Sequence, residues 1–494
     1  MKDSNVKYLK SIRFASVALA ALALSACTME PDYERPETPL DSKAEAMKEF
    51  KHADGLWKDA SPEALQKGKW WLMFEDEELD VLIASCREKN SNLRAAFYAV
   101  ESSRQKARMT QSDLFPHAGA NASWSKSQTS RNEFSSRGIF EDYRIGVGLT
   151  WDLDLFGRVQ ALMKSDVALA QAQYSAYESV MLMLESEVAS TYFTIRQYNT
   201  EIKILNDAIA TRKVQLSSVQ DEYRISSKDA LDLGRAEQLY YEAASQLASV
   251  TKYRDAMANY LAYIVGSVPS AQTVTEKLLN SDVPATPQII PSELLERRPD
   301  IAEWERKVYA ANFRIGSATS AFFPTIQITS SLDMASADIG NLLESNSLAW
   351  GVSPRLYLPI FQAGKLWAQR EVALAEHAGI VEQYKDKVMF AIYEVENALA
   401  NIKNLKDEYD ARSKVSDASI NVTKLTKDKF DAGVVNTFEL SDAQRLSLAN
   451  ERETIRLRGD RFRAVIELIR TIGGSPLSTQ ERAEHFENAQ TETE

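Results

Sequence analysis

The sequence predicts an α+β membrane protein with an internal two-fold repeat, in which short β-strands are joined to very long helical hairpins. Three observations predict this fold class. Landmark motifs recur at a nearly constant spacing of about 207 residues. Two stretches of roughly 65 residues carry apolar side chains three and four positions apart, as helices do. Other segments alternate apolar and polar residues, as strands with two different faces do.

The repeat is visible in paired motifs that keep their order in both halves. Pro116 ends "LFP", and Pro324 ends "FFP" 208 residues later. Gly157 in "DLDLFGR" and Gly364 in "LPIFQAGK" are 207 residues apart. These two prolines and two glycines mark the predicted helix–strand junctions, because both residue types interrupt helices. Two further pairs with a spacing of 207 are Tyr223 with Phe430 and Gly266 with Gly473.

The N-terminus has the outline of a lipoprotein signal peptide. Basic residues precede an apolar stretch, 14–24, that is too short to span a bilayer but suits a secretory signal. The stretch ends in Leu-Ser-Ala-Cys, which predicts removal of residues 1–26 and lipidation of Cys27. A plain signal peptide with a chance cysteine has the same outline. Thr28 follows the cysteine, and by resemblance to enterobacterial lipoproteins this favours the bacterial outer membrane.

The net charge, the spacing of the histidines and the missing motifs argue against several classes of function. The formal net charge of −12 argues against a nucleic-acid partner, since binding phosphates requires clustered Lys and Arg. The four histidines lie far apart, so no metal-ligand spacing is present. No phosphate loop and no nucleophile elbow occurs. The sequence therefore predicts neither an enzyme nor a bound cofactor.

The order of segments follows from the repeat. After the signal peptide, residues 27–69 are expected to form an acylated, extended segment. The first structural repeat spans 70–266, and a linker spans 267–298, with four prolines between residues 283 and 301. The second repeat spans 299–474, and a polar tail, 475–494, ends the chain.

Each repeat is expected to contain a medium helix and a long helical hairpin. The medium helices, about 92–115 and 299–322, end at the Phe-Pro pairs. The long helices run from about 158 to 222 and from 364 to 429, and each reaches on the order of 100 Å at 1.5 Å per residue. A helix of that length with a returning partner makes a hairpin that extends beyond any globular core. Its apolar seam in the first repeat is Leu184, Val188, Tyr192, Ile195, Tyr198, Ile202, Leu205 and Ile209.

Four strands are expected, at about 117–130, 141–155, 324–336 and 348–361. In "YRIGVGLTWDLDLF" one face is apolar and the other carries Arg, Gly, Thr and Asp. Segments of this length and alternation are typical of outer-membrane β-barrels, although a half-buried soluble sheet has the same period. No long apolar run follows Cys27, so any membrane-spanning part is expected to be β.

The number of strands predicts an oligomer. Four strands cannot close a barrel, and open edges in lipid leave backbone groups unpaired at several kcal/mol each. Two chains supply eight strands, whose interior side chains fill. Three chains supply twelve strands, the smallest multiple of four that leaves an aqueous lumen. The sequence therefore predicts a trimeric 12-stranded barrel continued by a helical barrel.

Several motifs together resemble the TolC-type outer-membrane factors, and in particular the lipoprotein branch that serves resistance-nodulation-division efflux pumps. These are "WWLMFEDEELDVLI" at 70–83, "PSELLERRPDI" at 291–301, both Phe-Pro helix ends, and "FDAGVVNTFELSDAQ" at 430–444. The resemblance covers Trp70 to Gly474. It implies a homotrimer with a barrel in outer-membrane lipid and a twelve-helix tunnel in the periplasm. A periplasmic adaptor would dock on the tips of the helices and link the tunnel to an inner-membrane pump.

The resemblance also assigns roles at the tips. Gly433 would bend the second tip and contribute to adaptor docking, but the matching position of the first tip is Ser226. If that turn requires a positive φ, serine strains it by about 1 kcal/mol. The periplasmic gate is placed on Phe438, Glu439 and Asp442, with Leu231 and Asp232 at the first tip. A competing interpretation is that Asn436 caps a helix with Glu439 in the capping box.

Other functions remain compatible with parts of the sequence. A duct for type I protein secretion would have the same fold. A coiled-coil lipoprotein that braces the envelope would explain the anchor and the long helices, but not the alternating strands. A lipid-anchored enzyme would need a nucleophile or an orienting histidine, and none is suggested by the motifs. The 11 methionines are scattered, so they do not favour copper or silver over organic cargo.

Overall fold

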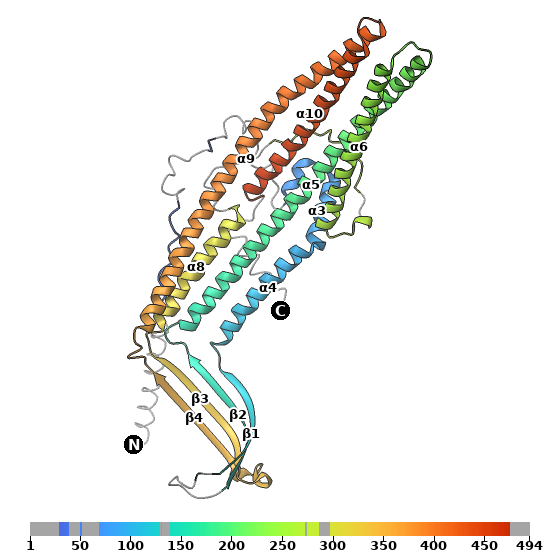
Figure 1. Ribbon diagram of the computed structural model, residues 1–494. Coiled ribbons are helices and arrows are strands. Elements are labelled where there is room, and N and C mark those ends of the chain that lie inside the picture. The colour runs from blue at the N-terminus through green and yellow to red at the C-terminus, as the bar shows by residue number, and fades with distance from the viewer. Residues whose placement is uncertain are drawn as a thin grey trace. The chain divides into compact units, whose positions relative to one another are not determined.

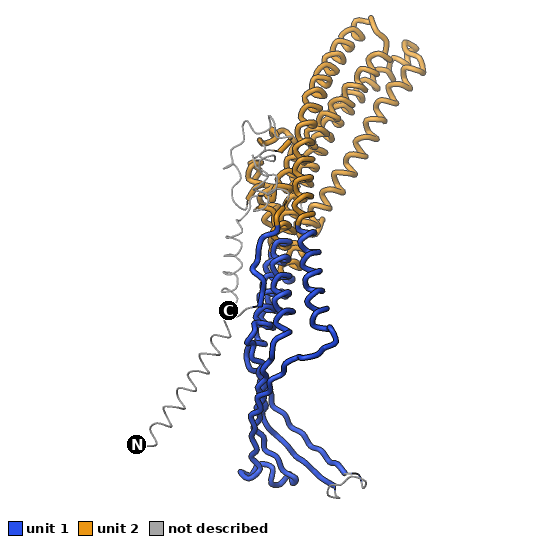
Figure 2. The backbone as a smooth tube through the Cα atoms, turned by 90° about the vertical axis from the view of Figure 1, so that its left-hand side faces the viewer, with its two compact units in different colours: residues 1–36, 98–174, 303–384 blue, residues 37–97, 175–302, 385–494 orange. Residues whose placement is uncertain are grey.

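In the computed structural model the chain forms two compact units, coloured separately in Figure 2. Each unit is built from segments of both repeats, so the repeat boundary does not separate the units. The first unit comprises Tyr98–Tyr174, Glu303–Tyr384 and the described residues before Glu37; the second comprises Glu37–Phe97, Ser175–Ala302 and the described residues from Lys385 onward.

The structure describes residues 29–38, 50–51, 69–128, 130, 139–271, 274–285 and 297–474. The predicted signal peptide 1–26, the lipidation site Cys27 and the tail 475–494 lie outside these residues, as do most of 27–69 and parts of the linker.

The first unit contains a four-stranded antiparallel sheet in the order β1-β2-β3-β4 (Figure 1). The strands are β1 His117–Gln128, β2 Ile139–Leu153, β3 Thr325–Ser336 and β4 Leu348–Tyr357. β4 ends four residues before the expected end at 361. Pro359 accounts for the difference, because proline lacks the N–H that a further ladder bond needs and keeps the preceding residue from pairing regularly.

The strand register separates an apolar face from a polar one. Asp152, Gln327 and Arg355 form a row of consecutive partners on the polar face. Side chains alternate along a strand, so the neighbouring rows point to the opposite face. One row on that apolar face consists of Ala120, Val147, Leu332 and Trp350. Within the part of the chain that the structure describes, β1 and β4 each pair on one side only.

Two helical hairpins dominate the rest of the chain, and they confirm the internal repeat. They are α5 Arg158–Arg224 with α6 Ala230–Ile264, and α9 Lys365–Asp431 with α10 Thr437–Thr471. Every boundary of the second hairpin lies 207 residues after its counterpart in the first. The shorter helical elements are η2 Trp70–Phe74, α3 Glu77–Lys89, α4 Ser91–Ser112, η3 Pro269–Ala271, α8 Pro299–Ser320, η5 Ile339–Asn341 and η6 Ser345–Ser347. Among the helices described, none is both long and apolar enough to cross a bilayer.

The core of the second unit gathers aromatic rings from three distant segments. η2 contributes Phe74, α5 contributes Phe193 and α10 contributes Phe462, all of them buried. The rings of Phe193 and Phe462 stack with centroids 4.5 Å apart, and the ring of Phe74 lies 4.9 Å from that of Phe193. The apolar residues of "WWLMF" therefore join α5 to α10, which ties the two repeats together in this unit.

The returning helices α6 and α10 end in equivalent glycine turns. Gly266 has a φ of 76° and Gly473 has a φ of 89°, a conformation that L-residues with a side chain rarely adopt. A Cβ atom on Gly473 would lie 2.8 Å from the carbonyl oxygen of Arg297, and one on Gly266 would lie 2.7 Å from backbone atoms of Lys89. Glycine is therefore required at both ends for conformation and for space.

Different side chains close these two helix ends in the same way. The Asn90 side-chain amide donates to the carbonyl oxygen of Ile264, the last residue of α6, at 2.7 Å. The Arg298 guanidinium donates to the carbonyl oxygen of Thr471, the last residue of α10, also at 2.7 Å. Both donors are buried, and each satisfies a carbonyl that has no partner within its own helix. The repeat thus preserves the bond and not the residue type.

Candidate functional site at the helical tips

The two tips have the same backbone geometry, although one uses serine where the other uses glycine. Gly433, just beyond α9, has a φ of 72°, and Ser226, just beyond α5, has a φ of 59°. Serine in this left-handed conformation costs roughly 1–2 kcal/mol more than glycine. A backbone bond of 2.9 Å closes each turn, from Ser227 N–H to Glu222 O and from Val434 N–H to Lys429 O.

Both returning helices begin with a capping side chain at matching positions. The Asn436 side-chain oxygen accepts the backbone N–H of Glu439 at 3.1 Å, and Asp229 accepts that of Asp232 at 2.8 Å. Each bond satisfies one of the unpaired N–H groups in the first helical turn. The capping interpretation therefore holds for the backbone of Glu439. Its carboxylate is exposed and stays available for another role.

The tips contact each other through two cation–π pairs that the sequence did not suggest. The guanidinium of Arg235 on α6 lies 5.0 Å from the ring centre of Phe438 on α10. The ammonium of Lys228 lies 5.5 Å from the ring centre of Phe430. In each pair the first tip supplies the cation and the second supplies the ring, and such contacts contribute about 0.5–1 kcal/mol at exposed sites. Phe438 is still 53% exposed, so its ring is only partly covered.

The remaining residues expected at the gate are largely accessible. Asp442 forms an ion pair with Arg445, three residues later on α10, at 2.7 Å. Both side chains are well exposed, so this pair adds little to stability. Leu231 is 59% exposed, and Asp232 is partly exposed. Within the described chain, no hydrogen bond or ion pair links these residues of the first tip to those of the second.

The interior of the second tip contains a row of buried polar side chains. Near the start of α10, three buried side-chain oxygens have no hydrogen-bond partner among the described residues: those of Thr437, Ser441 and Gln444. They lie at i, i+4 and i+7, along one stripe of the helix. The interior of the first tip is an apolar cluster of Leu216, Val219 and Ala236. Separating α10 from its neighbours would therefore give these polar atoms water partners.

The four predicted junction residues lie between helices and strands. Pro116 immediately precedes β1, and Pro324 immediately precedes β3. Gly157 immediately precedes α5 with a φ of 70°, and Gly364 immediately precedes α9 with a φ of 85°. Proline stops the incoming helix, and glycine allows the left-handed turn into the outgoing one.

Comparison with known proteins agrees with this architecture. The family model "Outer membrane efflux protein" matches residues 82–267 and 290–474, one match for each repeat. Outer membrane protein OprJ of Pseudomonas aeruginosa is 31% identical over 476 residues, covering 93% of this chain and 95% of that protein. Cation efflux system protein CusC of Escherichia coli K12 is 29% identical over 458 residues, covering 92% and 97%. Toluene efflux pump outer membrane protein TtgI of Pseudomonas putida is 29% identical over 468 residues, covering 94% and 98%.

Solved structures show the same fold. The open-state MtrE outer membrane channel of Neisseria gonorrhoeae superposes with a TM-score of 0.79 at 28% identity, covering 91% of this chain and 98% of that chain. The CmeC outer membrane channel of Campylobacter jejuni superposes with a TM-score of 0.86 at 20% identity, covering 94% and 98%. With the family model matched over both repeats, the chain belongs to the outer membrane efflux protein family, and its function is that of an outer-membrane efflux channel rather than an enzyme.

Proposed function

We propose that three copies of this chain form the exit duct of a tripartite efflux pump, which passively conducts small molecules from a periplasmic tunnel to the exterior. The observation that carries the proposal is the open four-stranded sheet with one apolar face. Its outer strands β1 and β4 are each left with one unpaired edge in the described chain. Joining these edges between three copies satisfies the backbone groups and closes a barrel of twelve strands.

The apolar face has the height that a membrane band requires. Trp124 stacks on Tyr143 at the end of the sheet near the β1–β2 connection, with ring centres 6.3 Å apart. Trp151 lies eight residues further along β2, which is about 26 Å of strand at roughly 3.3 Å per residue. A strand tilt of about 40° reduces this to roughly 20 Å, close to the apolar band of about 25 Å between aromatic girdles.

The proposed partners are a periplasmic adaptor docked on the tips and an inner-membrane resistance-nodulation-division pump. The accessible tip residues and the resemblance of the sequence to that branch support this assignment. The relatives include proteins named for cation efflux and for toluene efflux. Such different names support a duct that leaves selection of the cargo class to the pump upstream. They also favour efflux over protein secretion.

We also propose that the second tip is the moving part of the gate. Phe438 forms the apolar plug, and Glu439 and Asp442 form carboxylate rings with Asp232 close to them. The polar stripe on α10 supports this choice, because movement of α10 would give its unpartnered polar atoms water partners. The contact of Arg235 with Phe438 holds the second tip against the first in the closed state.

The duct is tested by recording currents from the purified protein in planar lipid bilayers. We expect discrete, long-lived conductance steps, because a closed barrel is a stable pore. The matched control is the same preparation after heat dissociation of the oligomer. Protein that binds the bilayer but never conducts would contradict the duct.

Lipidation of Cys27 is the last part of the proposal. A diacylated cysteine would hold the chain at the inner surface of the outer membrane even before the barrel closes. Intact-mass measurement of membrane-extracted protein is expected to show a chain that starts at Cys27 and carries acyl chains, and the variant Cys27→Ser is expected to lack them. An unmodified wild-type chain that retains residues 1–26 would rule the anchor out.

A further inference from the structure

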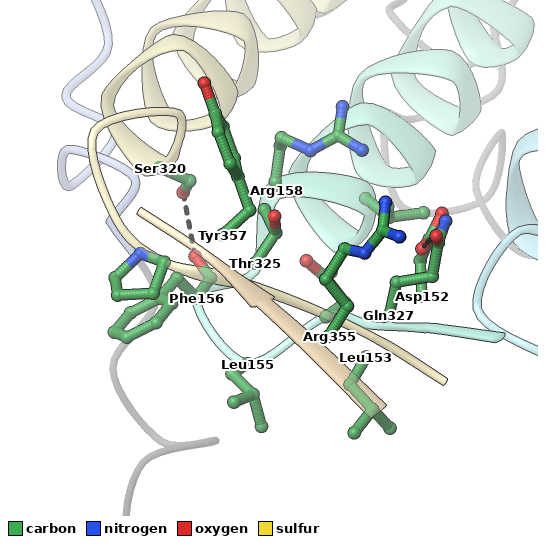
Figure 3. A pocket seen from close by; sticks show the side chains of 13 residues that line it. Asp152, Leu153, Leu155, Phe156, Arg158, Ser320, Thr325, Gln327, Arg355 and Tyr357 are labelled. Atoms are coloured by element: carbon green, nitrogen blue, oxygen red, sulfur yellow. Dashed lines mark hydrogen bonds between the residues drawn. The ribbon is translucent and has the colours of Figure 1, made fainter. Parts of the chain in front are cut away.

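A cavity of about 350 Å³ lies in the first unit, where the sheet meets the start of α5 (Figure 3). Its size falls within the range of ligand sites in proteins. The wall is formed by the last residues of β2 and β4, the first residues of β3 and the first residues of α5. Its polar lining residues include Asp152, Asp154, Arg158, Gln327, Arg355 and Tyr357.

Both acidic residues of the cavity already have neutral hydrogen-bond donors. The Asp152 carboxylate accepts the Gln327 side-chain amide at 2.9 Å. The Asp154 carboxylate accepts the backbone N–H of Gln160, in the first turn of α5, at 2.7 Å. The positive end of this 67-residue helix further offsets the charge of Asp154. The acids are therefore held in place by the fold.

The two arginines of the cavity, in contrast, have no such partners. Neither the Arg158 nor the Arg355 side chain forms a hydrogen bond or an ion pair with any residue in the described part of the chain. Both side chains are exposed, and Figure 3 shows them on the same side of the β-strands. They come from different elements, the start of α5 and the end of β4, so the fold brings them together. Planar guanidinium groups bind carboxylate and phosphate oxygens in a bidentate manner.

The strand register assigns the cavity to the lumen of the proposed duct. Arg355 pairs with Gln327, which pairs with Asp152, and this row lies on the polar face of the sheet. With the apolar face toward lipid, the polar face lines the lumen. Three copies then place six guanidinium groups at one level, at the inner end of the barrel. We propose that this level is an oxyanion-binding station of the duct, at which cargo that carries carboxylate or phosphate groups binds through Arg158 and Arg355.

This inference rests on the proposed duct, and block of the current by citrate tests it. Citrate is added on the side of the bilayer that the strand connections face, from which it reaches the station without passing the tips. We expect citrate to block the wild-type current. In Arg158→Gln/Arg355→Gln we expect the half-blocking concentration to rise about tenfold, because the bidentate donors are lost. The single variant Arg355→Gln, which changes only an exposed residue of an edge strand, is expected to show a smaller rise in the same direction.

The matched control is Lys126→Gln. Lys126 also lies in the sheet, but on the opposite face, where it bonds Glu141. This variant is expected to keep the wild-type half-blocking concentration, and retention of the oligomer on gels shows that each variant folds. Equal half-blocking concentrations in the wild type and both arginine variants would overturn the station, as would a conducting wild type that citrate does not block. A wild type without any current would instead overturn the duct.

Discussion

Replacing Arg298 by alanine is expected to destabilise the second unit by about 3–5 kcal/mol, the usual cost of removing one partner from a buried ion pair. Arg298 is only 5% exposed. Its guanidinium donates to Asp300 at 2.8 Å and to Glu394 at 2.6 Å, in addition to the carbonyl oxygen of Thr471. Alanine would leave two carboxylates and one helix-terminal carbonyl without this partner.

Asp300 shows how strongly this arginine acts. Burial by itself would raise the pKa of Asp300, but the hydrogen bonds and the charge of Arg298 outweigh it and hold the pKa below its usual value. A carboxyl whose pKa is lowered on folding stabilises the native state above its unfolded pKa, and this contribution is lost as the pH falls through the folded pKa. In Arg298→Ala this contribution of Asp300 is expected to disappear at neutral pH as well.

Thermal unfolding followed by circular dichroism measures this effect. The matched control is Arg224→Ala, since Arg224 forms an exposed ion pair with Asp221 near the first tip and is expected to change the melting temperature little. Equal melting temperatures for the two variants would show that the buried cluster around Arg298 does not hold the end of α10.

Opening of the gate is the second large effect that we expect. Phe438→Ala removes the proposed plug and the ring that faces Arg235, so single-channel conductance is expected to rise about twofold or more. Asp442→Ala removes the proposed ring of three carboxylates, so the current is expected to become less selective for cations. The melting temperature is expected to change little, because Phe438 is 53% exposed and the Asp442 side chain is 41% exposed.

The control for the plug is Phe390→Ala. Phe390 on α9 is also half-exposed, and the ammonium of Lys387 lies 5.8 Å from its ring centre, so the variant removes a similar cation–π pair away from the tips. Its conductance is expected to match that of the wild type. If Phe438→Ala and Asp442→Ala conduct like the wild type but melt at lower temperature, these residues stabilise the hairpin and the gate lies elsewhere.

The long helices could be predicted from the sequence because their signal is local. α5 contains neither glycine nor proline, and its apolar period continues to the tip, so the expected end at 222 lies within two residues of Arg224. The faces of the sheet could also be predicted, because alternation within one strand determines them. The end of β4 was misplaced because the apolar pattern continues past Pro359, where regular pairing stops.

Contacts between elements could not be predicted in this way. Helical periodicity does not say how two hairpins are rotated against each other, so the contact of Arg235 with Phe438 was missed although both residues lie in quoted or matching tip segments. Arg158 and Arg355 lie 197 positions apart in the sequence, and they line one cavity because the strand register places β4 beside β3 and β3 beside β2. From the sequence, Ser226 was recognised only as a serine at the position that matches Gly433. Its φ of 59° shows that the turn keeps its geometry without glycine.

The central claim is that three chains close one barrel, and native mass spectrometry of the detergent-extracted protein tests it most directly. Because each chain contributes four strands with two half-paired edges, we expect a single assembly with three times the mass of the mature, acylated chain. The assembly is expected to persist at dilutions at which loosely associated membrane proteins separate. A stable monomer that conducts by itself, or an assembly of two chains, would contradict the account.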